Sequence, residues 1–297
     1  MIDRVEALFQ RQLHGWPLLA RGVESLTSAE QRIVRIDWYE VYLRHIPHRV
    51  VSTTAAVDPA SVAKRPCFLC AQNLPPEEEG LAFGEDLVIY CNPFPIVQKH
   101  LTIADREHTP QRIAERFDRM LDLAAALDGY FVIYNGPECG ASAPDHLHFQ
   151  AGLRKDLPII RDTAQLNSLA VTNYGRRLLI FHDNDYRRLI DTLARATEVL
   201  EQVTCKGPEP LINVAALYAD GRWTVYLFPR GKHRPEVFHT GELTVSPATI
   251  DLCGILVVSM RRDFEKISGD RVAAIFDEVS LPVDQFEEVA KRLERVR

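Results

Sequence analysis

The stretch His146-Leu-His-Phe-Gln150 decides how the fold of this chain is interpreted. Two imidazoles and a carboxamide alternate with two apolar side chains, and this period of two is typical of a β-strand. On such a strand His146, His148 and Gln150 share one face, while Leu147 and Phe149 point into the core. The alternative is a half-buried strand whose histidines only form hydrogen bonds.

A polar, glycine-rich segment, residues 135–145, precedes this strand and reads Asn-Gly-Pro-Glu-Cys-Gly-Ala-Ser-Ala-Pro-Asp. Backbone N–H groups of such a loop, together with the hydroxyl group of Ser142, can bind phosphate oxygens. Two histidines and a glutamine in a row suit a reacting phosphate, because one imidazole can attack while its neighbours position the group. The loop and the strand together therefore predict phosphate chemistry.

The stretch from Tyr134 to Ala151 resembles the active-site strand of the histidine-triad superfamily, and its His-x-His-x-Gln pattern resembles the transferase branch. That branch contains the galactose-1-phosphate uridylyltransferases, the dinucleoside tetraphosphate phosphorylases and the GDP-galactose phosphorylases. Hydrolases of the superfamily have a third histidine where this chain has Gln150. The loop between Gly140 and His146 is one residue longer than in the first two families and one shorter than in the third, which leaves the substrate open.

Further motifs extend the resemblance over residues 35–290, in the same order along the chain. The segment from Leu87 to His108 resembles a second superfamily signature, in which Asn-x-Phe-Pro is followed by His-Leu-x-Ile and a later histidine. The segment Arg65-Pro-Cys-Phe-Leu-Cys70 resembles the zinc-binding segment of the uridylyltransferases. Four segments resemble the C-terminal half of the two phosphorylase families: residues 212–216, 223–230, 251–256 and 262–265.

The resemblance implies that His148 is the nucleophile, whose attack on the α-phosphorus of a nucleotide gives a nucleotidyl-imidazole. We expect His148 to face solvent, and its second ring nitrogen to donate to a backbone carbonyl of the same loop. Gln150 would hydrogen-bond a phosphate oxygen. Because a carboxamide does not exchange protons, Gln150 favours transfer or phosphorolysis over hydrolysis. Ser142 would stabilise charge on the phosphoryl oxygens, and His146 completes the catalytic set.

Cys67, Cys70, His108 and His146 are candidate ligands of a structural Zn²⁺ ion. Two thiolates and two imidazoles suit zinc and complete a tetrahedral site. The uridylyltransferase pattern selects His108, rather than His100, as the third ligand. His146 would then be a ligand two residues from the nucleophile, so the metal would fix the catalytic strand. The alternative is a pair of free buried thiols, since related enzymes work without zinc.

Substrate contacts are expected from three further places in the chain. The resemblance puts Asn92 and Phe94 in a turn that lines a nucleoside pocket. Asn135 and Gly140 belong to the glycine-rich loop and would also contact the substrate. The densest basic cluster, residues 230–234, contains Arg230 and Lys232, which could hold the outer phosphates of the substrate or an incoming phosphate ion. A solvated loop is the alternative for this cluster.

The amino-acid composition limits the classes of protein to which the chain can belong. The chain has 297 residues, of which 46% are hydrophobic and 26% charged, as in ordinary globular proteins. A net charge of −6 argues against a nucleic-acid partner. Apolar runs are too short for a membrane span, and the N-terminal residues do not resemble a signal peptide. Six irregularly spaced cysteines do not resemble a disulfide framework, which favours a reducing cytoplasm.

We expect an α+β fold: a histidine-triad and uridylyltransferase-like antiparallel sheet with flanking helices and two pseudo-repeated halves. The expected domains are a helical extension at 1–34, a catalytic half at 35–180, and a second half with C-terminal helices at 181–297. Strands are predicted near 49–53 and at 86–91, 99–104, 130–135, 146–152, 211–217 and 222–229. Helices are predicted to begin at Thr27 and Thr109 and to cover 185–203, 247–260 and 284–296. The hairpin at 211–229 is expected to mirror residues 86–104.

The function predicted from these features is nucleotidyl transfer or phosphorolysis through a covalent intermediate on His148. The substrate would be a nucleoside-diphosphate sugar or a dinucleoside polyphosphate, and the acceptor phosphate or a sugar phosphate. A nucleotide hydrolase and a nucleotide-binding protein without activity are the alternatives. We expect a monomer or a homodimer with no nucleic-acid or membrane partner.

Overall fold

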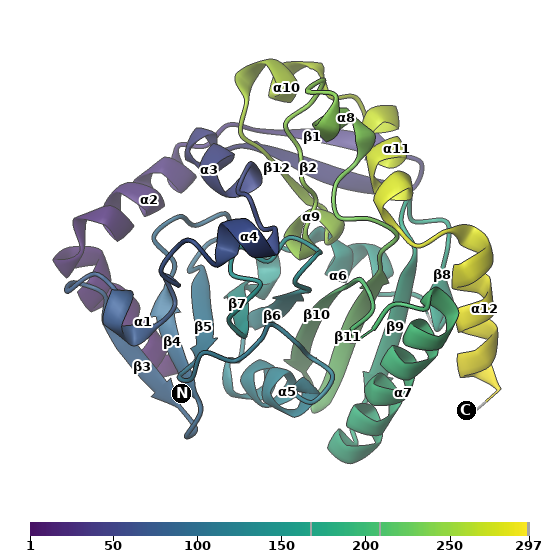
Figure 1. Cartoon of the computed structure of the whole chain (residues 1–297), viewed down its shortest axis with the longest axis horizontal. Helices are drawn as coiled ribbons and strands as arrows, with labels where there is room; N and C mark the ends of the chain where they lie inside the picture. Colours follow the sequence, from purple (N-terminus) through teal and green to yellow (C-terminus); the bar gives the residue numbers. More distant parts are fainter. Residues whose placement is uncertain (167, 208, 296–297) are drawn as a thin grey trace.

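Two sheets organise the chain in the computed structural model (Figure 1). The structure describes residues 1–166, 168–207 and 209–295. The nine-stranded sheet is antiparallel throughout and has the order β3-β4-β5-β7-β6-β10-β11-β9-β8. The three-stranded sheet has the order β1-β2-β12, with β12 parallel to β2.

The strands are β1 (Gln31–Ile36), β2 (Tyr39–His45), β3 (Gly80–Phe83), β4 (Leu87–Cys91), β5 (Leu101–Asp105), β6 (Tyr130–Asn135), β7 (His148–Leu153), β8 (Ala170–Val171), β9 (Leu178–Asp183), β10 (Ile212–Ala219), β11 (Arg222–Pro229) and β12 (Ile255–Val258). The α-helices are α1 (Ile2–Gly15), α2 (Pro17–Thr27), α3 (Val50–Thr53), α4 (Pro59–Val62), α5 (Phe117–Ala126), α6 (Pro158–Thr163), α7 (Tyr186–Thr204), α8 (Glu236–His239), α9 (Thr249–Leu252), α10 (Arg261–Lys266), α11 (Gly269–Val279) and α12 (Val283–Glu294). Short 3₁₀ helices cover Pro47–Arg49, Ala71–Asn73 and Arg154–Asp156.

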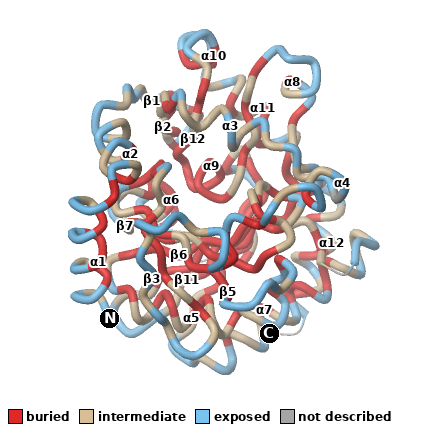
Figure 2. The backbone as a smooth tube through the Cα atoms, turned by 60° about the vertical axis from the view of Figure 1, so that its left-hand side comes forward, coloured by how far each residue is buried: buried red, intermediate tan, exposed pale blue. Residues whose placement is uncertain are grey.

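The large sheet is covered on both faces. Helices α1, α5, α7 and α12 pack on one face and share a hydrophobic core with it. The three-stranded sheet, together with α9 and α11, packs on the other face around a second core. Figure 2 shows that the buried segments follow the central strands, whereas the outer turns of the helices are exposed. The chain is thus the expected α+β fold with an antiparallel sheet and flanking helices.

The strand β7 has the predicted alternation. Leu147 and Phe149 lie in the core shared with α1, α5 and α7. His148 is opposite Ala104 and Gln150 is opposite Thr102 on β5, so these side chains share the other face. Two details of the prediction are wrong. The strand begins at His148, which leaves His146 in the preceding loop, and His148 is only 3% exposed instead of facing solvent.

The pseudo-repeat is present, but its halves correspond differently from the prediction. In the sheet order, β5-β7-β6 on one side of the centre mirrors β9-β11-β10 on the other. Helix α5 follows β5 and α7 follows β9, so the repeated unit is strand, helix, strand, strand. Residues 101–153 therefore correspond to residues 178–229, and the hairpin at 211–229 does not mirror residues 86–104. The predicted domain boundaries after residues 34 and 180 stay a prediction.

Two predicted elements near the N-terminus are wrong. Thr27 ends α2 instead of capping a new helix, because its hydroxyl group donates to the carbonyl of Val23 in the preceding turn. Residues 49–53, predicted as strand from their β-branched side chains, belong to a 3₁₀ helix and to α3. The strands of this region are β1 and β2, which lie nearer the N-terminus.

Two predicted helices are shorter in the structure. The helix expected from Thr109 begins only at Phe117, because the preceding residues form hydrogen bonds to other segments instead of to a helical turn. The helix expected at 247–260 is α9 alone. Gly254, with φ +105°, ends it, and a Cβ atom there would lie 2.9 Å from a Pro158 side-chain atom. The chain then continues as β12, which pairs with β2.

Among the helices that the structure describes, none combines the length and the apolar character needed to cross a membrane.

Candidate active site and metal site

Four predicted metal ligands come together beside the start of β7. The ligand atoms of Cys67, Cys70, His108 and His146 all lie within 4.8 Å of one another. The Sγ atom of Cys67 is 3.3 Å from Nδ1 of His146, and that of Cys70 is 3.1 Å from Nδ1 of His108. Burial, the largest single effect, raises the pKa of the Cys67 thiol, but the hydrogen bonds to His146 and to the Leu69 backbone and the charge of His146 together lower it below its usual value, which favours the thiolate that binds metals. The group can hold a metal ion.

The remaining nitrogens of the two imidazoles have partners of the kind that orient metal ligands. His146 donates from Nε2 to the carbonyl oxygen of Asp105 at 2.8 Å. Nε2 of His108 lies 3.5 Å from a carboxylate oxygen of Asp145. Both Nδ1 atoms are thereby left to face the two sulfur atoms, as expected when a carbonyl or carboxylate fixes the ring of a metal-binding histidine. The donor set, two sulfurs and two nitrogens, matches zinc in softness and number.

His148 stands at the first position of β7, two residues from this group. Its Nδ1 atom donates to the carbonyl oxygen of His146 at 2.9 Å, so the tautomer has its lone pair on Nε2. The structure shows no hydrogen bond to Nε2 from any described residue. Burial lowers the pKa of His148 to about 4, which keeps the ring neutral at pH 7. A neutral imidazole with a free Nε2 atom can act as a nucleophile.

Gln150 is oriented by His100. The Nε2 atom of His100 lies 2.8 Å from Oε1 of Gln150, and its Nδ1 atom accepts from the N–H group of Ile96 at 3.4 Å. The two contacts together assign the neutral tautomer with the proton on Nε2, which donates to Gln150. Burial lowers the pKa of His100 to about 3, in agreement with a neutral ring. The NH₂ group of Gln150 is left as a donor for an oxygen atom of a ligand.

The glycine-rich loop lies over the start of β7. Gly140 has φ +96°, and a Cβ atom there would lie 2.7 Å from the Cβ atom of Ala248, so its role is conformational. Arg65 donates to the carbonyl oxygen of Ser142 at 2.9 Å and lies 3.7 Å from a carboxylate oxygen of Asp145, which ties the loop to the metal-binding segment. The hydroxyl group of Ser142 has no hydrogen bond to any described residue.

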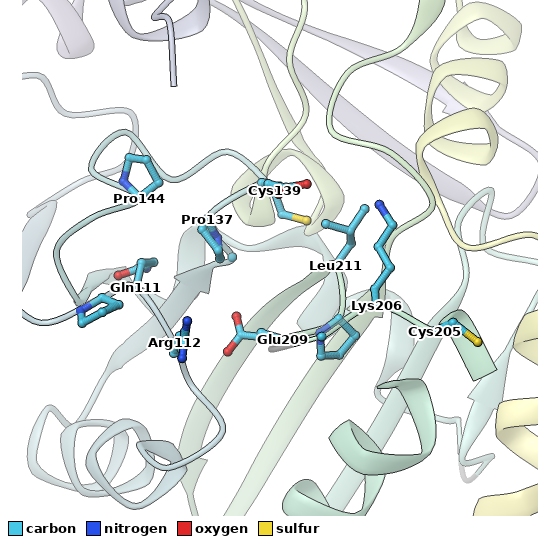
Figure 3. Close-up of a pocket in the computed structure, with 14 residues that line it drawn as sticks. Gln111, Arg112, Pro137, Cys139, Pro144, Cys205, Lys206, Glu209 and Leu211 are labelled. Carbon is cyan, nitrogen blue, oxygen red and sulfur yellow. The ribbon is translucent and has the colours of Figure 1, made fainter. Parts of the chain in front are cut away.

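A pocket of about 410 Å³ lies on the side of the loop that faces the second half of the chain (Figure 3). The loop residues Pro137, Cys139 and Pro144 line it from one side, and residues 205–207 and 209–211 from the other. Gln111 and Arg112 also line the pocket. Cys139 is fully buried, and burial raises the pKa of its thiol to about 12, so this cysteine is not a nucleophile.

The turn after β4 is held by Asn92. Its Nδ2 atom donates to Thr102 at 3.0 Å, and its Oδ1 atom accepts from the N–H group of Phe94 at 2.9 Å. Since Thr102 is opposite Gln150, this turn lies beside the catalytic strand. The ring of Phe94 is 43% exposed, which leaves a face available for stacking. Arg49, from a 3₁₀ helix, approaches the carbonyl oxygen of Phe94 at 3.5 Å.

Asn135 lies in a buried network at the end of β6. Its Oδ1 atom accepts hydrogen bonds from Asn213 at 2.9 Å and from the hydroxyl and N–H groups of Thr249 at 2.7 and 3.0 Å. Asn213 also donates to the carbonyl oxygen of Cys139 at 2.8 Å. The network therefore fixes the start of the glycine-rich loop. The Nδ2 atom of Asn135 has no hydrogen bond to a described residue and stays a candidate substrate contact.

The basic cluster does not form the phosphate site predicted around Arg230. That residue is 2% exposed, and its guanidinium group donates to Asn213 and to the backbone carbonyls of residues 279, 247, 232 and 233. Because each guanidinium nitrogen is engaged, the prediction that Arg230 binds substrate is wrong, and its role is structural. Lys232 pairs with Glu278 at 2.8 Å on the surface, and its predicted substrate contact stays a prediction.

The sequence gives no sign of the role of one residue near the site, Gln111, and places another, Arg49, in the wrong element. Gln111 forms hydrogen bonds to the backbone of His148, but the surrounding periodicity predicts a helix there, which hides this contact. Arg49 was expected in a strand. It contributes to lowering the pKa of His100 by charge repulsion, which places it among the groups around Gln150. Neither residue belongs to a pattern that a single sequence reveals.

Two family models match consecutive parts of the chain. Residues 8–153 match a domain of unknown function (DUF4922), and residues 154–295 match the GDPGP1-like C-terminal domain. The chain is 27% identical over 225 residues to GDP-L-galactose phosphorylase 2 of Arabidopsis thaliana, an alignment that covers 68% of this chain and 50% of that protein. The chain thus spans about half the length of this curated relative.

Solved structures with the same fold come from yeast. The Ap4A phosphorylase Apa2 in complex with AMP aligns with a TM-score of 0.59 at 16% identity, over 92% of this chain and 96% of that chain. The same enzyme in complex with Ap4A aligns with a TM-score of 0.56 at 15% identity, over 93% and 97%. The solved structures share the fold of the chain, and the two domain matches, the plant relative and the His-x-His-x-Gln strand together support the resemblance to the phosphorylase and transferase branch of the histidine-triad superfamily.

Proposed function

We propose that the chain is a nucleotidyltransferase of the phosphorylase type, acting on a nucleoside-diphosphate sugar or a dinucleoside polyphosphate. The observation that carries the proposal is the arrangement of His148, whose Nδ1 atom is fixed on the carbonyl of His146 while Nε2 has no partner among the described residues. The names of the similar proteins, a GDP-L-galactose phosphorylase and an Ap4A phosphorylase, support both substrate classes.

The reaction proceeds in two displacements. Nε2 of His148 attacks the α-phosphorus, a P–N bond forms, and the bond to the bridging oxygen breaks, so that the sugar phosphate or second nucleotide leaves with the electron pair. Inorganic phosphate or a sugar phosphate then attacks the same phosphorus and releases neutral His148. The NH₂ group of Gln150 and the hydroxyl group of Ser142 donate to the phosphoryl oxygens as charge develops.

The remaining residues bind and position the substrate. Phe94 stacks on the nucleoside base, beside the turn that Asn92 holds. Asn135 contributes its Nδ2 group, and the backbone of Gly140 lies in the loop over the phosphates. Lys232 reaches an outer phosphate if its ion pair with Glu278 opens. Arg49, whose Nη1 atom lies 3.5 Å from the carbonyl oxygen of Phe94, would contact the polyphosphate.

We propose zinc as the metal of the Cys67, Cys70, His108 and His146 group, since this donor set is typical of structural zinc sites. The ion would fix the loop that carries His146. No step of the reaction passes through it. All six cysteines are free, which supports a reducing cytoplasmic setting, and we expect a monomer or homodimer.

Trapping the covalent intermediate tests the proposal. The protein is incubated with α-³²P-labelled nucleoside-diphosphate sugars or dinucleoside polyphosphates and quenched in base, because phosphoramidates of histidine are stable there and labile in acid. We expect label on a peptide containing His148 and release of the label as nucleotide upon addition of phosphate. A His148→Ala variant that retains the wild-type rate, or label on another residue, would contradict the proposal.

A further inference from the structure

The strands β6 and β7 separate at the proposed nucleophile. Their ladder pairs Ile133 with Gln150 and ends there. Two residues further along each strand, Asn135 and His148 would be the next pair of the same kind, but the ladder does not continue to them. The backbone groups of His148 that face β6 therefore need another partner, because unpaired buried peptide groups are strongly unfavourable.

The carboxamide of Gln111 fills this opening. Its Oε1 atom accepts from the N–H group of His148 at 2.7 Å. Its Nε2 group donates to the carbonyl oxygen of His148 at 3.0 Å and to that of Asn135 at 2.9 Å. Gln111 is 1% exposed, so these bonds are shielded from water. One side chain thus stands in for the missing strand pairing on both backbone groups of His148.

The segment that carries Gln111 is itself fixed. The carbonyl oxygen of Thr109 accepts from the N–H group of Leu147 at 2.7 Å. On the other side, the N–H group of Ile113 donates to a carboxylate oxygen of Glu209 at 2.6 Å, and the hydroxyl group of Tyr134 donates to the other oxygen at 2.6 Å. Figure 3 shows Glu209 across the pocket from Gln111. Gln111 is therefore held in place without a substrate.

We infer that Gln111 is a positioning residue for His148. The three hydrogen bonds of Gln111 set the position and orientation of the nucleophile at the first residue of β7. The inference rests on the proposed function of His148. The peptide of His148 determines where its Cβ atom lies, and the bond to the His146 carbonyl then fixes only the ring. Loss of Gln111 leaves the ring hydrogen bond intact but frees the peptide, and displacements of about 1 Å lower reaction rates by up to about 100-fold.

Gln12 offers a matched control. It is also 1% exposed, and its carboxamide also bridges two backbone groups, donating to the carbonyl of Glu77 at 2.9 Å and accepting from the N–H group of Glu79 at 3.1 Å. It lies on α1, remote in sequence from the catalytic segments, and forms no bond to β7. Substitution of either glutamine by methionine removes a buried carboxamide and keeps the side-chain length.

The first measurement compares kcat, KM and Tm of Gln111→Met and Gln12→Met in the full chain, with the labelled nucleotide substrate that forms the adduct. We expect both variants to lose stability. Gln111→Met should lower kcat by about 10- to 100-fold with KM within about threefold, whereas Gln12→Met should keep kcat within about twofold. Equal kcat values in the two variants would overturn the inference. Gln111→Glu and Gln12→Glu, which keep the side-chain shape and the acceptor, allow the same comparison if a methionine variant does not fold.

The second measurement uses a nucleophile that needs no positioning by the strand. In His148→Gly, added imidazole can take the place of the missing ring, so Gln111→Met in that background should leave the imidazole-dependent rate unchanged. A rate that falls by the same factor as in the single variant would show that Gln111 acts on the substrate, and would overturn the inference. Absence of both a His148 adduct in the wild type and imidazole rescue contradicts the proposed function instead.

Discussion

The carbonyl oxygen of His146 accepts the Nδ1–H group of His148 at 2.9 Å, so the proposed nucleophile is bonded to the backbone of a proposed metal ligand. The imidazole of His146 is held in turn between Cys67 and the carbonyl of Asp105. Displacement of His146 would therefore move the oxygen atom that sets the tautomer of His148. This relationship would couple the proposed metal site to the proposed reaction without placing a metal at the reacting atoms.

Protein purified without chelator should contain about one zinc ion per chain, measured by elemental analysis. Cys67→Ser and His108→Ala should each reduce the metal content and the Tm, because binding of a structural metal contributes to the free energy of folding. Both should also lower kcat through the loosened His146 backbone.

His100→Ala is the matched control for the ligand assignment, since His100 bonds to Gln150 and Ile96 instead of the sulfur atoms. It should keep the metal. A native protein that is free of metal, with both thiols fully reactive to a modifying reagent, would remove the metal site from the proposal and leave the His148 mechanism standing.

Gln150→His should increase hydrolysis relative to phosphorolysis. The substitution restores a third imidazole, which can exchange protons with water, whereas the NH₂ group of Gln150 can only donate. Because His100 donates to Gln150 Oε1, the new imidazole can accept that bond and keep its orientation. The ratio of nucleoside monophosphate to diphosphate products, measured at fixed phosphate concentration, reports the change. An unchanged ratio would show that exclusion of water, not Gln150, selects the acceptor.

The sequence predicted the structure correctly where function and local pattern coincide. The alternation of polar and apolar residues around Phe149 predicted which face of β7 enters the core, and family motifs predicted that Cys67 and His146, 79 residues apart, would meet. It failed where distant contacts override local preference. Ile113 fits a helical stripe, yet its N–H group bonds to Glu209 and the helix begins later. The charge on Arg230 suggested a surface, although buried carbonyls surround it.

Arg230→Met should lower the free energy of unfolding by roughly 3 to 5 kcal/mol, because it leaves Asn213 and several buried carbonyl oxygens without a donor. Denaturant unfolding measures this loss. Since Arg230 is not available to a ligand, the KM for phosphate of the folded variant should stay within about twofold of the wild-type value. A large rise in KM with little change in stability would restore the phosphate-binding role.

The free energy of unfolding should fall with decreasing pH, and the titration of His100 should account for part of this fall. Burial lowers the pKa of His100 from 6.5 to about 3, so between these values the unfolded chain binds a proton that the folded chain does not. The unfolded state is therefore favoured as the pH falls below about 6.5, by about 1.4 kcal/mol per pH unit for one such group. His148 and His233, whose pKa values burial lowers to about 4, act in the same direction.

His100→Gln keeps a donor near Gln150 and removes this titration. Its unfolding free energy should be lower than that of the wild type at pH 7, because the bond from Ile96 is lost, but it should decrease less between pH 7 and pH 5. Between pH 7 and pH 5 the free energy of unfolding of the wild type should fall by about 2 kcal/mol more than that of the variant. His14→Gln, at an exposed position of α1, is the control and should follow the wild-type slope. Parallel curves for His100→Gln and the wild type, measured by urea unfolding at each pH, would show that His100 binds a proton as readily in the folded chain as in the unfolded chain. The acceptor role assigned to its Nδ1 atom would then be wrong.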